Sequence, residues 1–236
     1  THLDVVPPDL PLSEDAEWIS GRGVCDAKGI AAAMIAAADA LRAQGEERIG
    51  LLFTVGEEAD SDGAKAAQAL EPKGQFLVNG EPTENRLSIG QKGVLGVRIS
   101  ARGKAAHSAY PEEGRSAIEA LLRALERIRG LSLPADSLLG GSSLNIGRIS
   151  GGVAPNVIPA EASADLLFRT VTSPALLLAA IERSVTGEMG FEVTANSPPV
   201  RAPALAGWDT IVVKYGSDLP HLTEWGIGYQ MGPGTI

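Results

Sequence analysis

The sequence predicts an α/β protein with a central, mostly parallel sheet and a smaller α+β domain inserted into it. As far as Lys92, apolar runs alternate with helical patterns in the strand–helix–strand order of a parallel sheet. After Lys92 the order becomes strand, helix, two strands, helix and strand, which is that of a ferredoxin-like module. We therefore predict a first domain in two parts, residues 1–92 and 201–236, around a second domain at residues 93–200.

The first domain is expected to alternate strands with helices. An apolar run at residues 49–55 is typical of a buried strand, and a glycine-rich turn, Gly21–Gly29, leads into a helix that Gly45 ends. In parallel sheets, functional sites lie at the carboxyl ends of the strands. The expected strands are residues 1–6, 49–55 and 76–79, and the expected helices are residues 30–44 and 64–70.

The inserted domain shows clearer periodicity. Residues 94–101 alternate apolar with polar side chains, which indicates a half-buried strand. Residues 116–129 place their leucines and isoleucines on one face, opposite charged side chains, as an amphipathic helix does. The remaining expected elements are strands at 143–149, 160–170 and 191–195 and a helix at 174–185.

Composition and charge narrow the class of protein. The 236 residues are 44% hydrophobic and 21% charged, as in a folded globular protein. A net charge of −9 argues against a nucleic-acid partner, which would require a basic face. The longest apolar run, Ile30–Ala38, is too short to span a bilayer, so we expect a soluble protein without a membrane partner. The single cysteine, Cys25, permits a reducing compartment, and we expect a cytoplasmic location.

Both ends of the sequence look truncated. It opens on what reads as the tail of a strand and closes just after the turn Gly232–Gly234. We expect a fragment of a longer protein, truncated at both ends.

Acidic side chains and a histidine follow several of the expected strands. Glu57 and Glu58 are adjacent carboxylates at the end of an apolar run, and burying such a pair is costly unless a cation binds it. Imidazole and carboxylate groups gathered at strand ends are the ligand set of a hydrolytic metal site. The candidate ligands and their neighbours are His2, Asp4, Asp26, Glu57, Glu58 and Glu81.

Each of these motifs also has an ordinary explanation. The glycine-rich turn lacks the Gly-Lys-Ser/Thr ending of a phosphate-binding loop, so that function is excluded. Asp26 has the place of a helix cap, and a proline after Glu81 restricts that residue to extended geometry. The remaining ordinary explanations are solvated strand-end residues for His2 and Asp4 and a solvated acidic loop for Glu57 and Glu58.

The motifs taken in order resemble one family. It is the dinuclear zinc metallopeptidase and deacylase family of acetylornithine deacetylase, succinyl-diaminopimelate desuccinylase, aminoacylase and carboxypeptidase G. The sequence most resembles the acetylornithine deacetylases, and the resemblance spans essentially the whole chain. The motifs are His2-x-Asp4-Val5-Val6-Pro7, Gly21-Arg22-Gly23-x-x-Asp26-x-Lys28-Gly29, Glu57-Glu58, Gly80-Glu81-Pro82-Thr83, Lys104-x-x-His107-Ser108-Ala109-x-Pro111, Gly151-Gly152-x-x-x-Asn156-Val157-Ile158-Pro159, Arg169 and Gly232-Pro233-Gly234.

The resemblance implies a zinc-peptidase-like catalytic domain with two divalent metal ions, zinc in the first place and otherwise cobalt or manganese. His2 and Glu81 would bind one ion, Glu58 the other, and Asp26 would bridge them, with a cis peptide bond after Asp26. The family supplies a further histidine ligand after the Gly-Pro-Gly turn, which would lie beyond Ile236. His221 precedes that turn and is not expected to replace it.

The resemblance also assigns roles in catalysis. Glu57 would be the general base, and Asp4 would orient His2. The inserted domain would be the lid and dimerisation domain of a homodimer, and its His107 would polarise the scissile carbonyl in the partner subunit's active site. Asn156 and Arg169 would contact the substrate, with Arg169 pairing a carboxylate.

The expected function is hydrolysis of the amide bond of N-acyl amino acids by a metal-dependent deacylase. Glu81 favours this branch, because several aminopeptidase relatives carry aspartate at that position. A metallo-carboxypeptidase or dipeptidase of the same family, acting on peptides, is the first alternative. A non-catalytic, dimerising relative is the second, and it is disfavoured because binding alone would not need Glu57.

Overall fold

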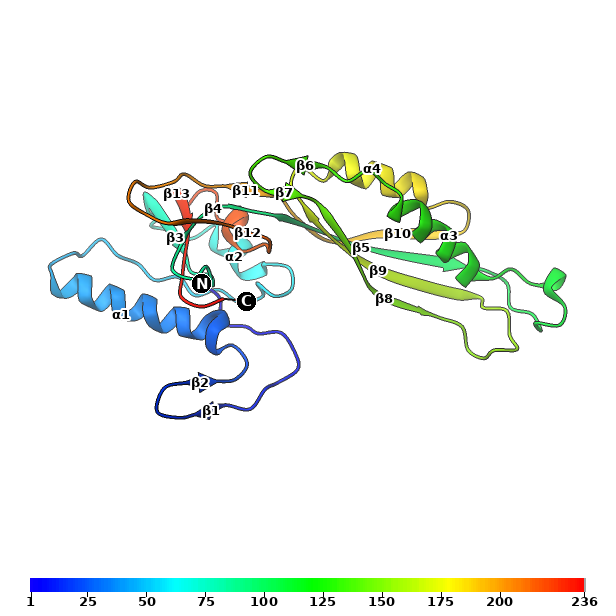
Figure 1. Ribbon diagram of the computed structural model, residues 1–236, viewed down its shortest axis with the longest axis horizontal. Helices are drawn as coiled ribbons and strands as arrows, with labels where there is room; N and C mark the ends of the chain where they lie inside the picture. The colour runs from blue at the N-terminus through cyan, green and yellow to red at the C-terminus, as the bar shows by residue number, and fades with distance from the viewer. Residues whose placement is uncertain (236) are drawn as a thin grey trace. The chain divides into compact units, whose positions relative to one another are not determined.

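The computed structural model describes residues 1–235, which form two compact units (Figure 1). Unit 1 comprises Thr1–Gln91 and Val200–Ile236, and unit 2 comprises Lys92–Pro199. Each unit has its own main sheet. None of the helices among the described residues is long and apolar enough to cross a membrane.

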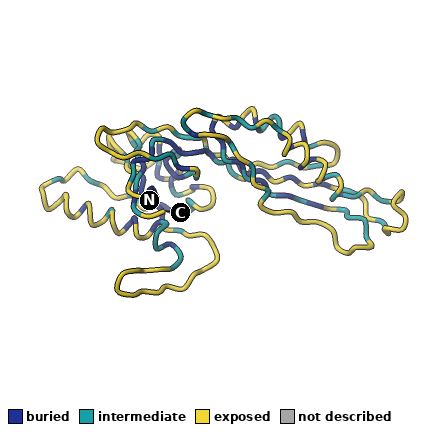
Figure 2. The backbone as a smooth tube through the Cα atoms, in the orientation of Figure 1, coloured by how far each residue is buried: buried dark blue, intermediate teal, exposed yellow. Residues whose placement is uncertain are grey.

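Unit 1 combines a short hairpin, helical segments and a five-stranded sheet. The glycine-rich turn leads through the helical turn η1 into helix α1, as expected, and most of α1 is exposed (Figure 2). The strands are β1 (Ser13–Glu14), β2 (Ile19–Ser20), β3 (Phe76–Asn79), β4 (Leu87–Gln91), β11 (Val200–Arg201), β12 (Thr210–Val213) and β13 (Ile227–Gln230), and the helical segments are η1 (Val24–Gly29), α1 (Ile30–Ala43), α2 (Asp62–Ala67) and η3 (Leu219–His221).

The sheet of unit 1 is mixed. Its strand order is β11-β4-β13-β3, and β12 also pairs with β4. The pairs β13–β3 and β12–β4 are parallel, whereas β11 and β13 run antiparallel to β4. The α/β class is confirmed, and the sheet combines parallel and antiparallel pairs.

Two expected strands of unit 1 are not formed as such. The runs at residues 1–6 and 49–55 meet only in an isolated parallel bridge between His2 and Thr54. Leu51, Phe53 and Val55 are exposed, so the run is not a buried strand within the described residues. Apolar character alone does not form a strand, because a strand needs paired backbone along its length, and the one β-bridge of residues 49–55 among the described residues is that of Thr54 with His2.

Unit 2 is an α+β sandwich with ferredoxin-like strand order. Its antiparallel sheet has the order β10-β5-β9-β8, so the first strand lies between the third and the fourth. Helices α3 and α4 lie on one side of this sheet (Figure 1). The elements are β5 (Gly93–Arg102), η2 (Pro111–Glu113), α3 (Ala117–Arg129), β6 (Ala135–Asp136), β7 (Gly140–Gly141), β8 (Ser143–Gly151), β9 (Glu161–Thr170), α4 (Ala175–Ser184) and β10 (Met189–Ser197).

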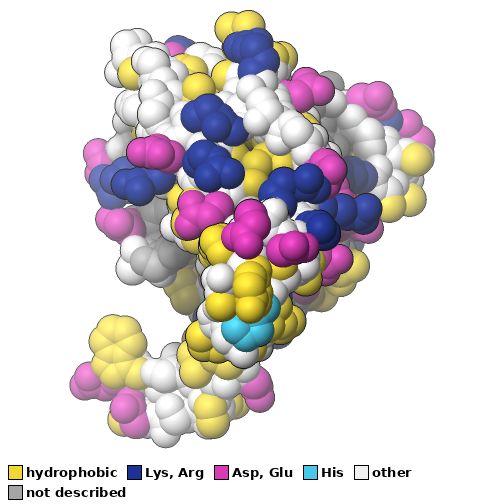
Figure 3. All heavy atoms as spheres, turned by 90° about the vertical axis from the view of Figure 1, so that its right-hand side faces the viewer, with side chains coloured by type: hydrophobic (Ala, Val, Ile, Leu, Met, Phe, Trp, Pro, Cys, Tyr) yellow, Lys and Arg dark blue, Asp and Glu magenta, His cyan; other side chains and the backbone are white. Residues whose placement is uncertain are grey.

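The core of unit 2 follows from alternation in β5 and β9. Val97 and Ile99 of β5 and Phe168 of β9 point to the helices and are almost fully buried, together with Leu121 of α3 and Ile181 of α4. The intervening side chains form the other, polar face, on which Arg98 pairs with Asp165. The face shown in Figure 3 mixes Lys and Arg with Asp and Glu side chains.

Candidate metal centre

His2 is the buried centre of the candidate site. Its side chain is 1% exposed, and both ring nitrogens have partners. Nε2 lies 3.0 Å from Oδ1 of Asp26, and Nδ1 lies 3.1 Å from the backbone carbonyl oxygen of Asp4. A buried imidazole with one nitrogen fixed by a carbonyl and the other facing a carboxylate is oriented in the way that metal-binding histidines are.

Asp26 stands on the irregular turn η1 and does not cap helix α1. Asp26 and Ala27 have non-helical backbone angles, and the peptide bond between them is cis, as the resemblance implies. The cap position of α1 is Gly29, which has no side-chain cap bond, while the carboxylate of Asp26 faces His2. Gly23 begins this turn at φ 77°, and a Cβ atom there would lie 2.5 Å from Val5, so glycine is required.

Asp4 fixes the loop that carries Glu57 and Glu58. Its carboxylate accepts hydrogen bonds from the backbone N–H of Glu58 at 3.1 Å and from that of Glu57 at 3.4 Å. Its Oδ1 lies 3.5 Å from Nδ1 of His2, farther than the carbonyl oxygen of Asp4 itself. Asp4 therefore touches His2 mainly through its backbone, and its carboxylate positions the Glu57–Glu58 turn.

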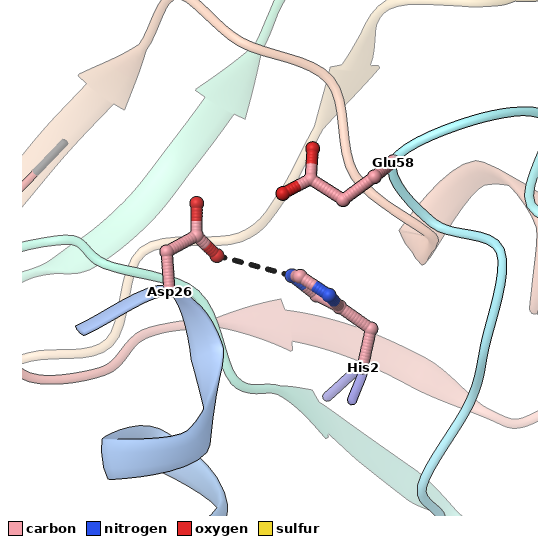
Figure 4. A group of neighbouring side chains, drawn as sticks. All are labelled: His2, Asp26 and Glu58. Atoms are coloured by element: carbon pink, nitrogen blue, oxygen red, sulfur yellow. Dashed lines mark hydrogen bonds and ion pairs between the residues drawn. The ribbon is translucent and has the colours of Figure 1, made fainter. Parts of the chain in front are cut away.

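Three side chains converge from separate segments of unit 1 (Figure 4). One ligand atom each of His2, Asp26 and Glu58 lies within 4.8 Å of the others. One imidazole nitrogen and two carboxylate oxygens form a donor set that suits Zn²⁺ and related divalent ions. The residues present therefore fit a divalent cation.

Glu81 lies outside this group of three, although it was expected to join His2 and Asp26 at one metal ion. Its side chain is 3% exposed, and its Oε1 accepts a hydrogen bond from the amide of Asn79 at 3.4 Å. The residues after it pack on the Gly-Pro-Gly turn, with Thr83 N–H donating to the carbonyl of Gly232. A Cβ atom at Gly232 would lie 2.6 Å from the carbonyl oxygen of Glu81, so only glycine allows this approach.

The site holds more acidic groups than its single imidazole can balance. Burial, followed by nearby carboxylates including Asp218, raises the pKa of Glu57 to about 7, although His2 opposes the rise. Burial also raises the pKa of Glu81 well above its ordinary value. Burial lowers the pKa of His2, but the hydrogen bond to Asp26 and the charges of Glu81 and Glu57 outweigh it and raise that pKa to about 9. A bound cation would relieve this excess of buried negative charge.

The other three predicted site residues, His107, Asn156 and Arg169, belong to unit 2. His107 pairs with Val157 in an antiparallel bridge, and the N–H of Ser108 donates to the carbonyl of Asn156 at 3.0 Å. The loops that carry His107 and Asn156 are therefore side by side. Arg169 lies on β9, opposite Val94 of β5 in the ladder.

Buried polar residues behind the ligands had not been predicted from the sequence. Thr54, Asn79, Ser217, Asp218 and Gln230 are each at most 5% exposed. Thr54 and Asn79 stand at the ends of apolar runs, where a polar residue interrupting the run was the available signal. Ser217, Asp218 and Gln230 carry no such local signal.

Comparison with known proteins shows what the chain is similar to. The peptidase dimerisation domain family matches residues 89–190. A peptidase M20 domain-containing protein of Schizosaccharomyces pombe is 40% identical over 243 residues, covering all of this chain and 61% of that protein. The chain belongs to the M20 peptidase family.

Two further proteins are similar to this chain. A protein of Aspergillus fumigatus named as a probable carboxypeptidase is 39% identical over 276 residues, which cover all of this chain and 62% of that protein. A solved tripeptidase from Staphylococcus aureus shares the fold, with a TM-score of 0.74 at 21% identity over 98% of this chain and 70% of the tripeptidase. This M20 chain therefore spans 61% to 62% of the length of these two curated relatives.

Proposed function

We propose that this protein is a metal-dependent hydrolase that cleaves the C-terminal peptide bond of peptides. The observation that carries the proposal is the convergence of His2, Asp26 and Glu58 within 4.8 Å, beside the half-buried Glu57. The names of several relatives, probable carboxypeptidases at 38% to 39% identity, support the choice of a peptide substrate.

His2, Asp26, Glu58 and Glu81 are the residues that would hold the metal, as one or two divalent ions, with zinc proposed first and cobalt or manganese as substitutes. When bound, such an ion supplies a Lewis acid that polarises a carbonyl and lowers the pKa of water. The buried imidazole and the excess of carboxylates fit this role.

Glu57 is the proposed general base. Its carboxylate would accept a proton from the attacking water as the water oxygen bonds to the amide carbonyl carbon. The same carboxyl group would return that proton to the leaving nitrogen as the carbon–nitrogen bond breaks, so that one water and one peptide give a carboxylic acid and an amine. The carboxylate of Asp4 accepts a hydrogen bond from the backbone N–H of Glu57.

We propose that unit 2 is the lid and dimerisation domain, corresponding to the expected residues 93–200. In a homodimer, His107 would donate a hydrogen bond to the carbonyl oxygen of the substrate as negative charge develops on it. Arg169 would bind the free carboxylate of the substrate through its planar guanidinium, with Asn156 as a further polar contact.

Deacylation of N-acyl amino acids is the second candidate, favoured by Glu81 at the position where several aminopeptidase relatives carry aspartate. Both reactions break an amide next to a free carboxylate and would use the same groups. They differ only in what is attached to the acyl side, so a substrate panel separates them.

The test combines metal analysis with paired variants. The purified protein is analysed for bound metal and assayed on dipeptides, longer peptides with free or amidated C-termini, and N-acyl amino acids. Glu57→Gln should lower kcat by at least about 10²-fold, because a positioned general base is lost, while the metal content stays near that of the wild type. Asp60→Asn changes an exposed carboxylate on the same loop and should keep full activity.

Two results would contradict the proposal. One is a wild-type protein that hydrolyses none of these amides after loading with zinc, cobalt or manganese. The other is near-normal turnover by Glu57→Gln. Cleavage of N-acyl amino acids without cleavage of peptides would favour the deacylase.

A further inference from the structure

Two adjacent polar residues, Ser217 and Asp218, are buried behind the metal centre in unit 1. Their side chains are 4% and 2% exposed, and they stand immediately before η3. Buried polar groups need hydrogen-bond partners, so the identity of those partners shows what the residues hold in place. The two side chains reach different segments that carry candidate ligands.

Asp218 reaches the segment of His2 and the Glu57–Glu58 loop through Thr54. Its Oδ2 accepts a hydrogen bond from the hydroxyl of Thr54 at 2.7 Å. Thr54 forms the bridge with His2, and its backbone N–H and carbonyl bond to Thr1 and Leu3 on either side of His2, each at 3.0 Å. Thr54 also lies two residues before Gly56, where the loop of Glu57 and Glu58 turns.

Ser217 reaches the segment of Glu81 through two amide side chains. Its hydroxyl lies 2.8 Å from Oε1 of Gln230 and 2.7 Å from Oε1 of Gln91. The same Oε1 of Gln230 accepts from the amide of Asn79 at 3.4 Å, and that amide also lies 3.4 Å from Oε1 of Glu81. A continuous line of polar groups therefore joins Ser217 to the carboxylate of Glu81.

We propose that Ser217 and Asp218 are positioning residues that set the spacing between the two ligand-bearing segments of the metal centre. Asp218 fixes His2 and Glu58 through Thr54, and Ser217 fixes Glu81 through Gln230 and Asn79. Because the two residues are consecutive, they couple both segments to one short piece of backbone. This inference rests on the proposed metal-dependent function, but neither residue touches metal or substrate.

Burying these polar residues lowers the stability of the fold, which argues that they have a role beyond folding. Oδ1 of Asp218 and Nε2 of Gln91 are buried without a hydrogen-bond partner among residues 1–235. A buried carboxylate with one oxygen unsatisfied lowers stability relative to an apolar residue of similar size. Groups that surround metal ligands typically change metal affinity 10- to 100-fold when they are removed.

The test measures metal affinity rather than activity alone. Zn²⁺ and Co²⁺ affinities are determined by competition with a chromophoric chelator, and the visible absorption of the Co²⁺-loaded protein reports ligand geometry. Ser217→Ala and Asp218→Ala should each weaken affinity by about 10- to 100-fold and alter the Co²⁺ spectrum. Asp218→Asn, which keeps an oxygen for the Thr54 hydroxyl, should restore most of the affinity.

Ser88→Ala is the matched control for Ser217→Ala. Ser88 is 2% exposed in the same unit, and among the described residues its hydroxyl donates only to the nearby carbonyl of Gly90, at 3.1 Å. The control should lower the denaturant midpoint by an amount similar to that of Ser217→Ala, yet keep its metal affinity within about twofold of wild type. A similar loss of stability with a different metal affinity would distinguish a positioning role from general destabilisation.

The inference is overturned if folded Ser217→Ala and Asp218→Ala bind metal with wild-type affinity and spectrum, or if Ser88→Ala loses as much affinity. If either alanine variant does not fold, Thr54→Val breaks the Asp218 connection and Asn79→Ala breaks the Ser217 connection, and unchanged affinity in these variants overturns it equally. A wild-type protein that binds no divalent metal would refute the proposed function itself. Metal affinity that is unchanged in all of these variants would refute only this inference.

Discussion

Replacing Asp4 with alanine should loosen the metal centre without removing a candidate ligand. The carboxylate of Asp4 accepts from the backbone N–H of Glu58 at 3.1 Å and, over a longer distance of 3.4 Å, from that of Glu57. Without it, the loop that presents Glu58 to His2 and Asp26 is free to adopt other conformations. Metal binding must then supply the free energy that orders the loop.

The size of the effect follows from these contacts. A hydrogen bond to a charged acceptor contributes about 1.5–3 kcal/mol net. The side chain of Asp4 is 26% exposed and its second bond is long, so we take about 2 kcal/mol for the pair. Since about 1.4 kcal/mol is a tenfold change, the metal dissociation constant should rise about 30-fold in Asp4→Ala.

Asp15→Ala is the matched control. The carboxylate of Asp15 also accepts two backbone hydrogen bonds, from Glu17 and Trp18 at 2.8 Å each, on an exposed turn that contains no candidate ligand. Chelator competition and calorimetric titration with Zn²⁺ should show weakened binding only in Asp4→Ala. Equal metal affinities for the two variants would refute the assignment of Asp4 to the ligand-bearing loop.

Two further predictions concern unit 2. His107→Ala and Glu57→Gln should each be inactive alone. Mixing the two variants under conditions of subunit exchange should recover activity, because one site of each hybrid dimer regains both groups. Confirmed exchange without recovery of activity would exclude action across the dimer. The hydrogen bond from Arg98 lowers the pKa of Asp165, so the stability that this pair adds is present above about pH 4 and is lost as the pH falls through the lowered pKa. Both side chains are more than a third exposed, so solvent screens the pair and Asp165→Asn should lower the denaturation midpoint only slightly at pH 7, with the difference shrinking toward pH 3.

Local patterns determined much of this protein. The alternation of residues 94–101 and the apolar face of residues 116–129 predicted β5 and α3, because burial of one face imposes a period of two on strands and of 3.6 on helices. The order of elements then indicated the ferredoxin-like sheet of unit 2. In unit 1, the residue types at His2, Asp26 and Glu58 indicated a metal site, since imidazole and carboxylate groups are ligands that divalent metal ions prefer in proteins.

Tertiary structure decided which of these groups meet. The sequence predicted Glu81 on one ion with His2, Glu58 on the other and Asp26 between them; the folded chain brings one ligand atom each of His2, Asp26 and Glu58 within 4.8 Å, and Asn79 donates a hydrogen bond to the buried Glu81 beside them. It also reduced the expected strand at residues 49–55 to a single bridge, because apolar character does not specify a backbone partner. The hydrogen bond between Thr54 and Asp218 joins residues 164 positions apart. No local periodicity encodes such a contact. It forms only after folding has buried separate segments together, where their polar groups can no longer form hydrogen bonds with water.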